Sequence, residues 1–128
     1  MRNSKIIYVL IACLVLSVAC VCAAIQPIKL DGKLVNYSVP KSPGSVDSFV
    51  LASFDDDTYQ LELDFLGSAE DLTIEIWGDD GIRAFYVTTD VTNGLQVFAD
   101  LSNSNAGAFE VYIYNKEGIY ITGYFELL

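Results

Sequence analysis

The sequence has no histidine, and its three cysteines, Cys13, Cys20 and Cys22, all lie within the first 24 residues. Residues 25–128 therefore lack the side chains that Ser-His-Asp and Cys-His nucleophilic sites require. The usual transition-metal ligand sets are excluded on the same ground, because they depend on histidine and cysteine. No disulfide can form within residues 25–128, so side-chain packing must stabilise this part of the chain.

Positive charge is also scarce. Seven lysine and arginine residues stand against 17 aspartate and glutamate residues, which gives a formal net charge of −10. We do not expect nucleic acid as a partner, because phosphate binding needs clustered lysine and arginine. Anionic lipid surfaces are disfavoured for the same reason. The sequence has neither a glycine-rich phosphate loop nor a dinucleotide fingerprint, and we expect no cofactor.

Catalysis by paired carboxylates remains open, since a glycosidase needs only two acids at a suitable separation. With 17 acidic residues in the chain, however, some pair meets that condition in any fold. The pattern is therefore uninformative, and we predict that the chain is not an enzyme.

The first 24 residues are predicted to be an N-terminal export signal helix. Arg2 and Lys5 precede an apolar run whose only polar member is Ser17. A positively charged start followed by such a run is typical of a signal peptide, and small residues favour cleavage after Ala23 or Ala24. Cleavage would remove both basic residues and deepen the formal charge from −10 by two, to −12.

Two alternatives to cleavage stay open. Residues 6–25 are long enough to span a bilayer as an uncleaved anchor, and Cys20 follows an approximate lipobox and could carry a lipid. Membrane contact is expected only by one of these two routes. All three interpretations place residues 25–128 outside the cytoplasmic membrane. The expected location is thus the periplasm, the outer envelope surface or the extracellular space.

Residues 25–128 are predicted to form one all-β domain, because short alternating segments follow one another between turn signals. Their spacing is typical of a β-sandwich or a barrel. Residues 40–45 are the one clear loop. Strands are expected at residues 27–31, 34–39, 47–54, 58–65, 71–77, 82–89, 95–101, 108–115 and 119–127.

Side-chain parity predicts the register of the last hairpin, because a one-residue slip would turn every core side chain toward solvent. The bulky apolar residues of both segments occupy odd positions. Odd-numbered residues of one strand must therefore pair with odd-numbered residues of the other. A three-residue loop at Lys116–Gly118 meets this condition, with the glycine free to take a positive φ. The prediction sets Ile113 opposite Ile121 and Phe109 opposite Phe125.

A second hairpin is predicted at residues 78–81, where parity requires a loop of even length. Asp80–Gly81 is a preferred two-residue type I′ turn. It would set Ile76 opposite Phe85 and Ile74 opposite Val87.

The order of these segments resembles a known family. It runs from Leu61-Glu-Leu-Asp-Phe65 through Leu72-Thr-Ile-Glu-Ile76 and Ala106-Gly-Ala-Phe-Glu-Val-Tyr-Ile113 to Gly123-Tyr-Phe-Glu-Leu127. This order is similar to small secreted Bacteroidetes proteins that are described only as a domain of unknown function. The resemblance covers nearly all of residues 25–128 and implies an antiparallel immunoglobulin-like β-sandwich of about 7–9 short strands. It supplies no catalytic residue.

The acidic run Asp55, Asp56 and Asp57 is the candidate metal site, because carboxylates are the hard oxygen ligands that Ca²⁺ prefers. The opposing interpretation is a solvated turn, since three consecutive acids lack the alternating spacing of a dedicated calcium loop. The strand register on either side of this run stays open as well.

Aromatic residues form the candidate binding surface. If Phe109 and Ile113 face inward, the tyrosines between and after them face outward, and Tyr114 lies opposite Tyr120. Phe98 is expected to face outward on its own strand. The predicted binding residues are Tyr112, Tyr114, Tyr120, Tyr124 and Trp77. Such a row suits a protein partner or a glycan, although tyrosine also stabilises any sheet through cross-strand pairs.

The sequence therefore predicts an exported, non-catalytic module for protein or glycan interaction. Two alternatives stay open. One is a structural or assembly subunit of the cell envelope that pairs through an open sheet edge. The other is an inhibitor of an exported enzyme, for which the acidic charge would suit a basic target.

Overall fold

The computed structural model describes residues 25–34 and 46–128. The predicted export signal, with the lipid site at Cys20, and the loop at residues 40–45 lie outside the described residues, as does nearly all of the strand predicted at 34–39. The described elements are β1 (Ile25–Ile28), β2 (Leu30–Leu34), the short 3-10 helix η1 (Val46–Ser48), β3 (Val50–Asp55), β4 (Gln60–Phe65), β5 (Ala69–Gly78), β6 (Arg83–Val91), β7 (Gln96–Asp100), β8 (Gly107–Tyr114) and β9 (Ile119–Leu127).

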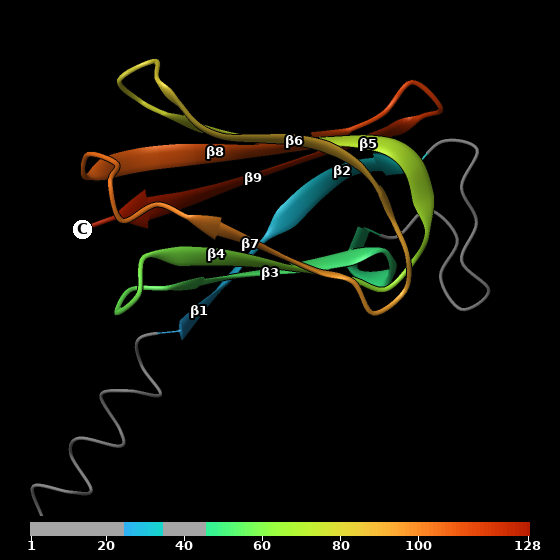
Figure 1. Cartoon of the computed structure of the whole chain (residues 1–128), viewed down its shortest axis with the longest axis horizontal. Helices are drawn as coiled ribbons and strands as arrows, with labels where there is room; N and C mark the ends of the chain where they lie inside the picture. Colours follow the sequence, from blue (N-terminus) through green and yellow to red (C-terminus); the bar gives the residue numbers. More distant parts are fainter. Residues whose placement is uncertain (1–24, 35–45) are drawn as a thin grey trace, which may run out of the picture.

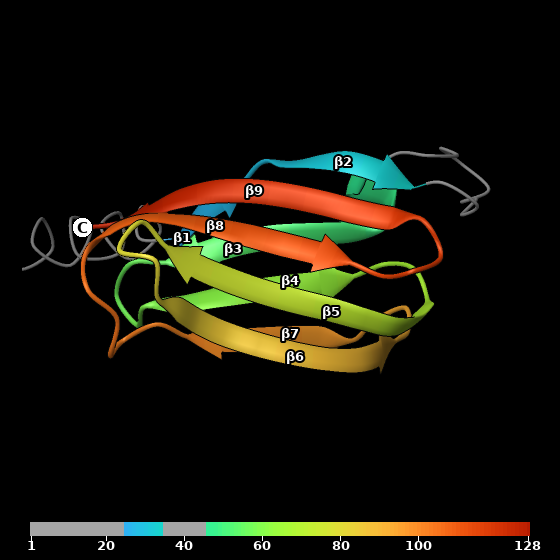
Figure 2. The same cartoon turned by 90° about the horizontal axis from the view of Figure 1, so that it is seen from above.

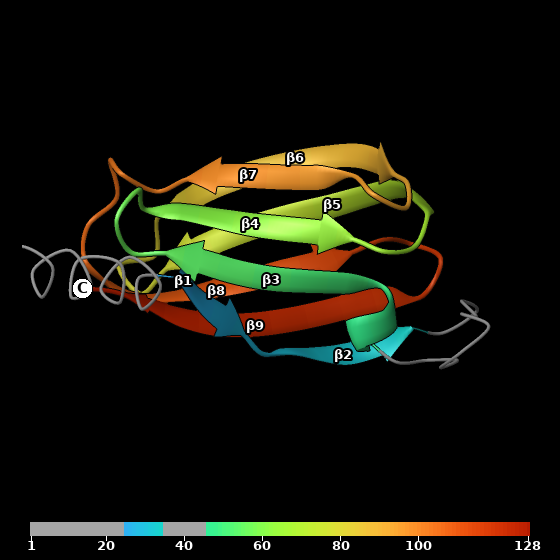
Figure 3. The ribbon, with the colours of Figure 1, turned by 90° about the horizontal axis from the view of Figure 1, so that it is seen from below.

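Two sheets pack face to face (Figure 1), with strand orders β1-β3-β4-β7 and β2-β9-β8-β5-β6. All the strand pairs are antiparallel. Alternate residues of each strand face the space between the sheets, so the predicted all-β sandwich is confirmed. The strand predicted at residues 27–31 is wrong in one respect, because the chain passes at Lys29 from β1 in one sheet to β2 in the other (Figure 3).

The core lies between the two sheets and consists of aliphatic and phenylalanine side chains. Phe54 on β3 meets Phe125 on β9 across the sandwich, with ring centroids 5.0 Å apart. Phe125 also stacks on its cross-strand neighbour Phe109, with centroids 5.4 Å apart. Full burial of one such side chain stabilises the fold by about 1.5–3 kcal/mol.

The last hairpin has the predicted register. Ile113 pairs with Ile121 and Phe109 pairs with Phe125. The backbone N–H of Asn115 donates to the carbonyl of Ile119 at 3.1 Å. The loop is therefore the three residues 116–118, and its glycine takes a φ of +118°.

The hairpin between β5 and β6 has the predicted register in its strands, with Ile76 opposite Phe85 and Ile74 opposite Val87. The predicted two-residue turn is wrong, however, because the N–H of Gly78 donates to the carbonyl of Ile82 at 3.0 Å and the loop has three residues.

The cause of the longer turn lies in a side chain. The Asp80 carboxylate accepts a hydrogen bond from the backbone N–H of Ile82 at 3.0 Å, a local bond that competes with strand pairing. A β-bulge at Ala84 absorbs the extra residue and sets Arg83 opposite Trp77. Because a bulge reverses the side-chain alternation, Arg83 joins Tyr86 and Thr88 on the outer face of the sheet.

Candidate functional site

Six aromatic side chains lie on the outer face of the five-stranded sheet, which Figure 2 presents to the viewer. We call this set the aromatic face: Trp77, Tyr86, Tyr112, Tyr114, Tyr120 and Tyr124. The structure thus brings together all five residues that the sequence predicted. It adds Tyr86, which the sequence analysis missed, although its even position between the inward Phe85 and Val87 already placed it outward.

Strand pairing arranges this outer face in three cross-strand rows. The first row is Tyr124, Glu110, Trp77 and Arg83. The second row is Asp31, Thr122, Tyr112, Glu75 and Tyr86. The third row is Lys33, Tyr120, Tyr114, Thr73 and Thr88. Tyr114 therefore lies opposite Tyr120, as predicted, and in the first two rows rings alternate with polar groups from β9 to β6.

The aromatic face is open to solvent at three of its members. Tyr86, Tyr120 and Tyr124 are 53%, 54% and 69% exposed. Phe98 also faces outward, as predicted, and is 51% exposed. It lies on β7 of the other sheet, however, and so does not belong to this surface.

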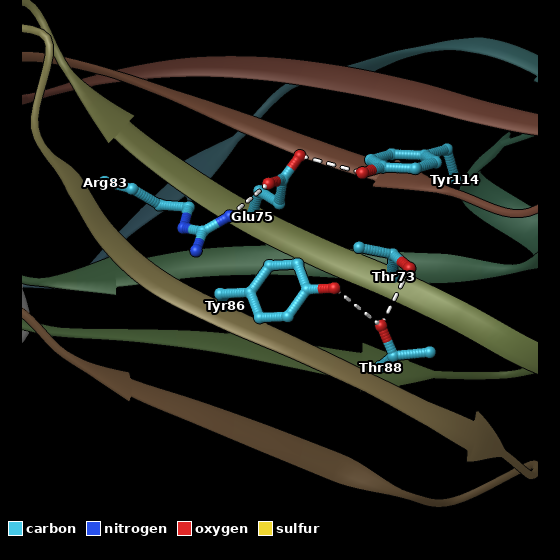
Figure 4. A network of polar contacts seen from close by, with 6 residues as sticks. All are labelled: Thr73, Glu75, Arg83, Tyr86, Thr88 and Tyr114. Atoms are coloured by element: carbon cyan, nitrogen blue, oxygen red, sulfur yellow. Dashed lines mark hydrogen bonds and ion pairs between the residues drawn. The ribbon is translucent and has the colours of Figure 1, made fainter.

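Glu75 is the centre of the polar contacts on this face (Figure 4). Its Oε2 accepts a hydrogen bond from the hydroxyl of Tyr114 at 2.9 Å, and its Oε1 pairs with Nη1 of Arg83 at 3.0 Å. The carboxylate lies on β5, and its two partners reach it from the neighbouring strands β8 and β6. The Glu75 side chain is only 15% exposed, whereas that of Arg83 is 43% exposed.

Arg83 also lies over two rings. Its guanidinium carbon is 4.2 Å from the ring centroid of Tyr86 and 5.7 Å from that of Trp77. Both distances are within the range of a cation–π interaction. The bulge at Ala84 is therefore what brings this cation to the aromatic face.

Two tyrosine hydroxyls are held as donors to carboxylates. The hydroxyl of Tyr112 donates to Glu110, and this hydrogen bond, with burial second, raises the pKa of Tyr112 to about 12. The hydrogen bond to Glu75 raises the pKa of Tyr114 in the same direction. Both phenols therefore keep their protons to a higher pH than an unperturbed tyrosine does.

A surface depression of about 540 Å³ lies at the middle of the aromatic face. Its lining consists of Glu75, Trp77, Tyr112, Tyr114 and Tyr120. It combines ring surfaces with oriented hydroxyl and carboxylate groups, the composition of a site that holds a ligand by stacking and hydrogen bonding. Four of the five predicted binding residues line it.

The candidate metal residues lie at the end of β3 and in the turn that follows it, and Asp55, the last residue of β3, pairs with Gln60, the first residue of β4. The carboxylate of Asp55 accepts a hydrogen bond from the backbone N–H of Asp57 at 2.9 Å. The carboxylate of Asp56 accepts a hydrogen bond from Nε2 of Gln26 at 3.0 Å. Among residues 25–34 and 46–128, no group of three or more acidic, histidine or cysteine side chains is placed to hold a metal ion. Calcium binding by these three residues therefore stays a prediction without support from geometry.

Two neighbouring carboxyl groups, those of Glu62 and Asp64 on β4, lie on the outer face of the four-stranded sheet and were not predicted. Burial and the neighbouring Asp64 raise the pKa of Glu62. One carboxylate oxygen of Asp64 is buried without a hydrogen-bond partner. These two acids face away from the aromatic face.

None of the helical segments within the described part of the chain has the length and apolar character needed to cross a bilayer.

Comparison with known proteins identifies a matching family and a similar solved structure. Residues 27–127 match the family described as "Domain of unknown function (DUF3244)". The chain is also similar to a DUF3244 family protein from Bacteroides vulgatus, solved as an immunoglobulin-like β-sandwich. The TM-score is 0.63 and the identity 18%, over 80% of this chain and 97% of the other. The comparison with curated proteins finds no match.

Proposed function

This chain belongs to the DUF3244 family, and because the description of that family assigns no activity, we propose a function from the residues of the chain itself. In this proposal the chain is an exported, non-catalytic binding module that works in the periplasm, on the envelope surface or outside the cell. The aromatic face is the surface with which it holds a protein or a glycan.

The observation that carries this proposal is the concentration of tyrosine on one surface. Five of the six tyrosines in the described part of the chain lie on the aromatic face, and the sixth, Tyr59, lies in the turn before β4. Tyrosine gives a binding surface apolar area together with a polar tip, and it is enriched where proteins meet ligands. A role in sheet stability alone would not require three of these rings to be more than half exposed.

A double substitution tests the binding role. Tyr120→Ala with Tyr124→Ala removes two exposed rings without opening the core, so the domain is expected to stay folded and to lose its ligand. The matched control is Leu51→Ala with Phe98→Ala, which removes comparable exposed apolar area from the other sheet. Glycan arrays and pull-downs from envelope extracts compare both variants with the parent chain. Identical binding profiles for a folded aromatic-face variant and the parent chain would rule the proposal out.

Export is tested on the protein made in its own host. Mass spectrometry of the mature N-terminus distinguishes a free Ala24 or Ile25, a lipidated Cys20 and a retained anchor. A full-length chain recovered from the cytoplasmic fraction would contradict export.

Assembly in the envelope is the second candidate, and the length of β6 favours it. This strand has nine residues and lies at the edge of the five-stranded sheet, so one side of its backbone has no strand partner among the described residues. Such an edge is able to accept a strand of another chain. Oligomers that form with rising concentration, and that vanish when proline replaces Thr89 in β6, would favour assembly over a monomeric binder.

A further inference from the structure

The depression on the aromatic face combines four aromatic rings with a single charged group in its lining, the carboxylate of Glu75. The face of an aromatic ring carries partial negative charge, because of the ring quadrupole. Ring faces and a carboxylate therefore attract the same kind of ligand group, a cation.

This surface already holds one cation of its own. Arg83 contacts Glu75 at 3.0 Å and lies over the rings of Tyr86 and Trp77. Figure 4 shows that Arg83 approaches Glu75 from the side of β6, whereas the hydroxyl of Tyr114 approaches from the side of β8. Arg83 itself is not part of the lining of the depression. A guanidinium group is thus stable beside the depression. The lining of the depression offers the same combination of ring faces and a carboxylate.

The charges around the depression sum to a negative value. Glu75 and Glu110 lie in the first two rows, and Arg83 balances only one of them. On β2, Lys33 lies opposite Tyr120 and Asp31 opposite Thr122, so this strand adds one charge of each sign. The formal charge of the whole chain, −10, attracts a basic partner over longer distances.

From these contacts, and resting on the binding role proposed above, we infer that the depression receives a lysine or arginine side chain of a basic protein partner. The cation lies against the rings of Trp77 and Tyr120, close to the carboxylate of Glu75. A neutral glycan would stack on the same rings but would gain little from the charge.

The chain contains a built-in reporter for this event, because Trp77 is its only tryptophan and lines the depression. The probe is the peptide Gly-Arg-Gly-Arg-Gly, compared with the same peptide in which citrulline replaces both arginines. Citrulline has the shape of arginine without its charge. We expect a saturable change in Trp77 fluorescence with the arginine peptide and binding weaker by about tenfold with citrulline. Added salt should weaken the binding of the arginine peptide but not that of the citrulline peptide.

Two substitutions with opposite expected effects sharpen the test. Glu75→Gln removes the charge at the depression and should weaken arginine-peptide binding by about five- to tenfold. Arg83→Gln removes the competing cation and should strengthen binding by about threefold. Glu62→Gln is the control, since it makes the same charge change on the outer face of the other sheet and should leave the affinity as it is. Circular dichroism confirms that each variant is folded, and Arg83→Gln decides the question if Glu75→Gln fails to fold.

Several outcomes would overturn the inference. They are equal binding of the two peptides, weaker binding by Arg83→Gln, and no fluorescence response to the arginine peptide. Oligosaccharide binding on an array, lost in the Tyr120→Ala, Tyr124→Ala variant, would assign the depression to a glycan and leave the binding role intact. The binding role itself fails only if that variant and the parent chain bind the same molecules.

Discussion

Trp77 and Arg83 lie directly opposite each other across β5 and β6, although the pairing of Ile76 with Phe85 predicts Ala84 as the partner of Trp77. The bulge that changes this pairing begins at the three-residue turn, where the Asp80 side chain binds the backbone of Ile82 at 3.0 Å. Without the bulge, Arg83 would share the parity of Phe85 and point toward the core. The composition of the aromatic face therefore depends on a turn at the end of the sheet.

Replacing Gly32 by alanine is expected to destabilise the domain by about 2–4 kcal/mol. Its φ is +156°, and a Cβ there would collide with the carbonyl oxygen of Tyr120 and approach Cα of Ile121 to 2.7 Å. Both obstacles are backbone atoms of β9 and are unable to move aside. The free energy of unfolding from urea titration measures the loss.

Gly94→Ala is the control for Gly32→Ala, because Gly94 has a φ of +93° but open space where a Cβ would lie. It should cost only about 1 kcal/mol, through backbone strain alone. Equal losses in the two variants would show that close packing of β2 against β9 is not what requires glycine at position 32.

Phe54→Ala is expected to cost about 3–5 kcal/mol. The side chain is 1% exposed, and its ring contacts Phe125 across the two sheets, so its removal leaves a cavity in the core. Phe98→Ala, at a position that is 51% exposed, should change stability by less than about 0.5 kcal/mol. Thermal unfolding ranks the two variants, and a loss for Phe98→Ala as large as for Phe54→Ala would mean that another part of the protein covers the outer face of β7.

Much of this architecture could be predicted from side-chain parity. The pairs Ile113–Ile121 and Ile76–Phe85 follow from alternation, because a register error of one residue would expose every core side chain. The outward tyrosines follow from the same rule. The bulge beside Trp77 could not be predicted, since it depends on one hydrogen bond that a backbone N–H donates to an aspartate side chain, in a turn that also fits a shorter loop.

The passage between sheets at Lys29 was unpredictable for a different reason. Ile28 and Leu30 are both buried and flank an exposed residue, which is also the pattern of one continuous strand. Alternation reports which side chains are buried but not which sheet they complete. The hydrogen-bond network around Glu75 likewise needs three strands to be placed side by side, and local sequence does not contain their order.

Tyr114→Phe is expected to destabilise the domain by about 1 kcal/mol. It removes the hydroxyl that donates to Glu75 at 2.9 Å and leaves the carboxylate with Arg83 as its partner. Tyr124→Phe is the control, because Tyr124 is 69% exposed and its hydroxyl makes no hydrogen bond within the described residues. Urea unfolding of both variants measures the difference. Equal stabilities would mean that water replaces the Tyr114 hydroxyl at no cost.

The stability of the domain is expected to fall as the pH rises from 10 to about 12, and Tyr112 is expected to contribute to the fall. Its pKa is raised from 10.0 to about 12 by the hydrogen bond to Glu110. Between these values the unfolded chain releases the phenolic proton while the folded chain keeps it. The contribution is therefore complete below pH 10 and is lost as the pH approaches 12. Tyr114, whose pKa is raised by Glu75, acts in the same direction.

Tyr112→Phe tests this linkage, because it removes one titrating group and keeps the ring. The free energy of unfolding of this variant should fall less steeply above pH 10 than that of the parent chain, while Tyr124→Phe should keep the parent slope. Tyrosinate absorbance of the folded protein, followed over the same range, should show one phenol fewer at the alkaline end of the titration in Tyr112→Phe. A slope equal to that of the parent chain in Tyr112→Phe would show that the bond to Glu110 does not hold the proton, because the free energy of unfolding and the protonation of this hydroxyl are thermodynamically linked.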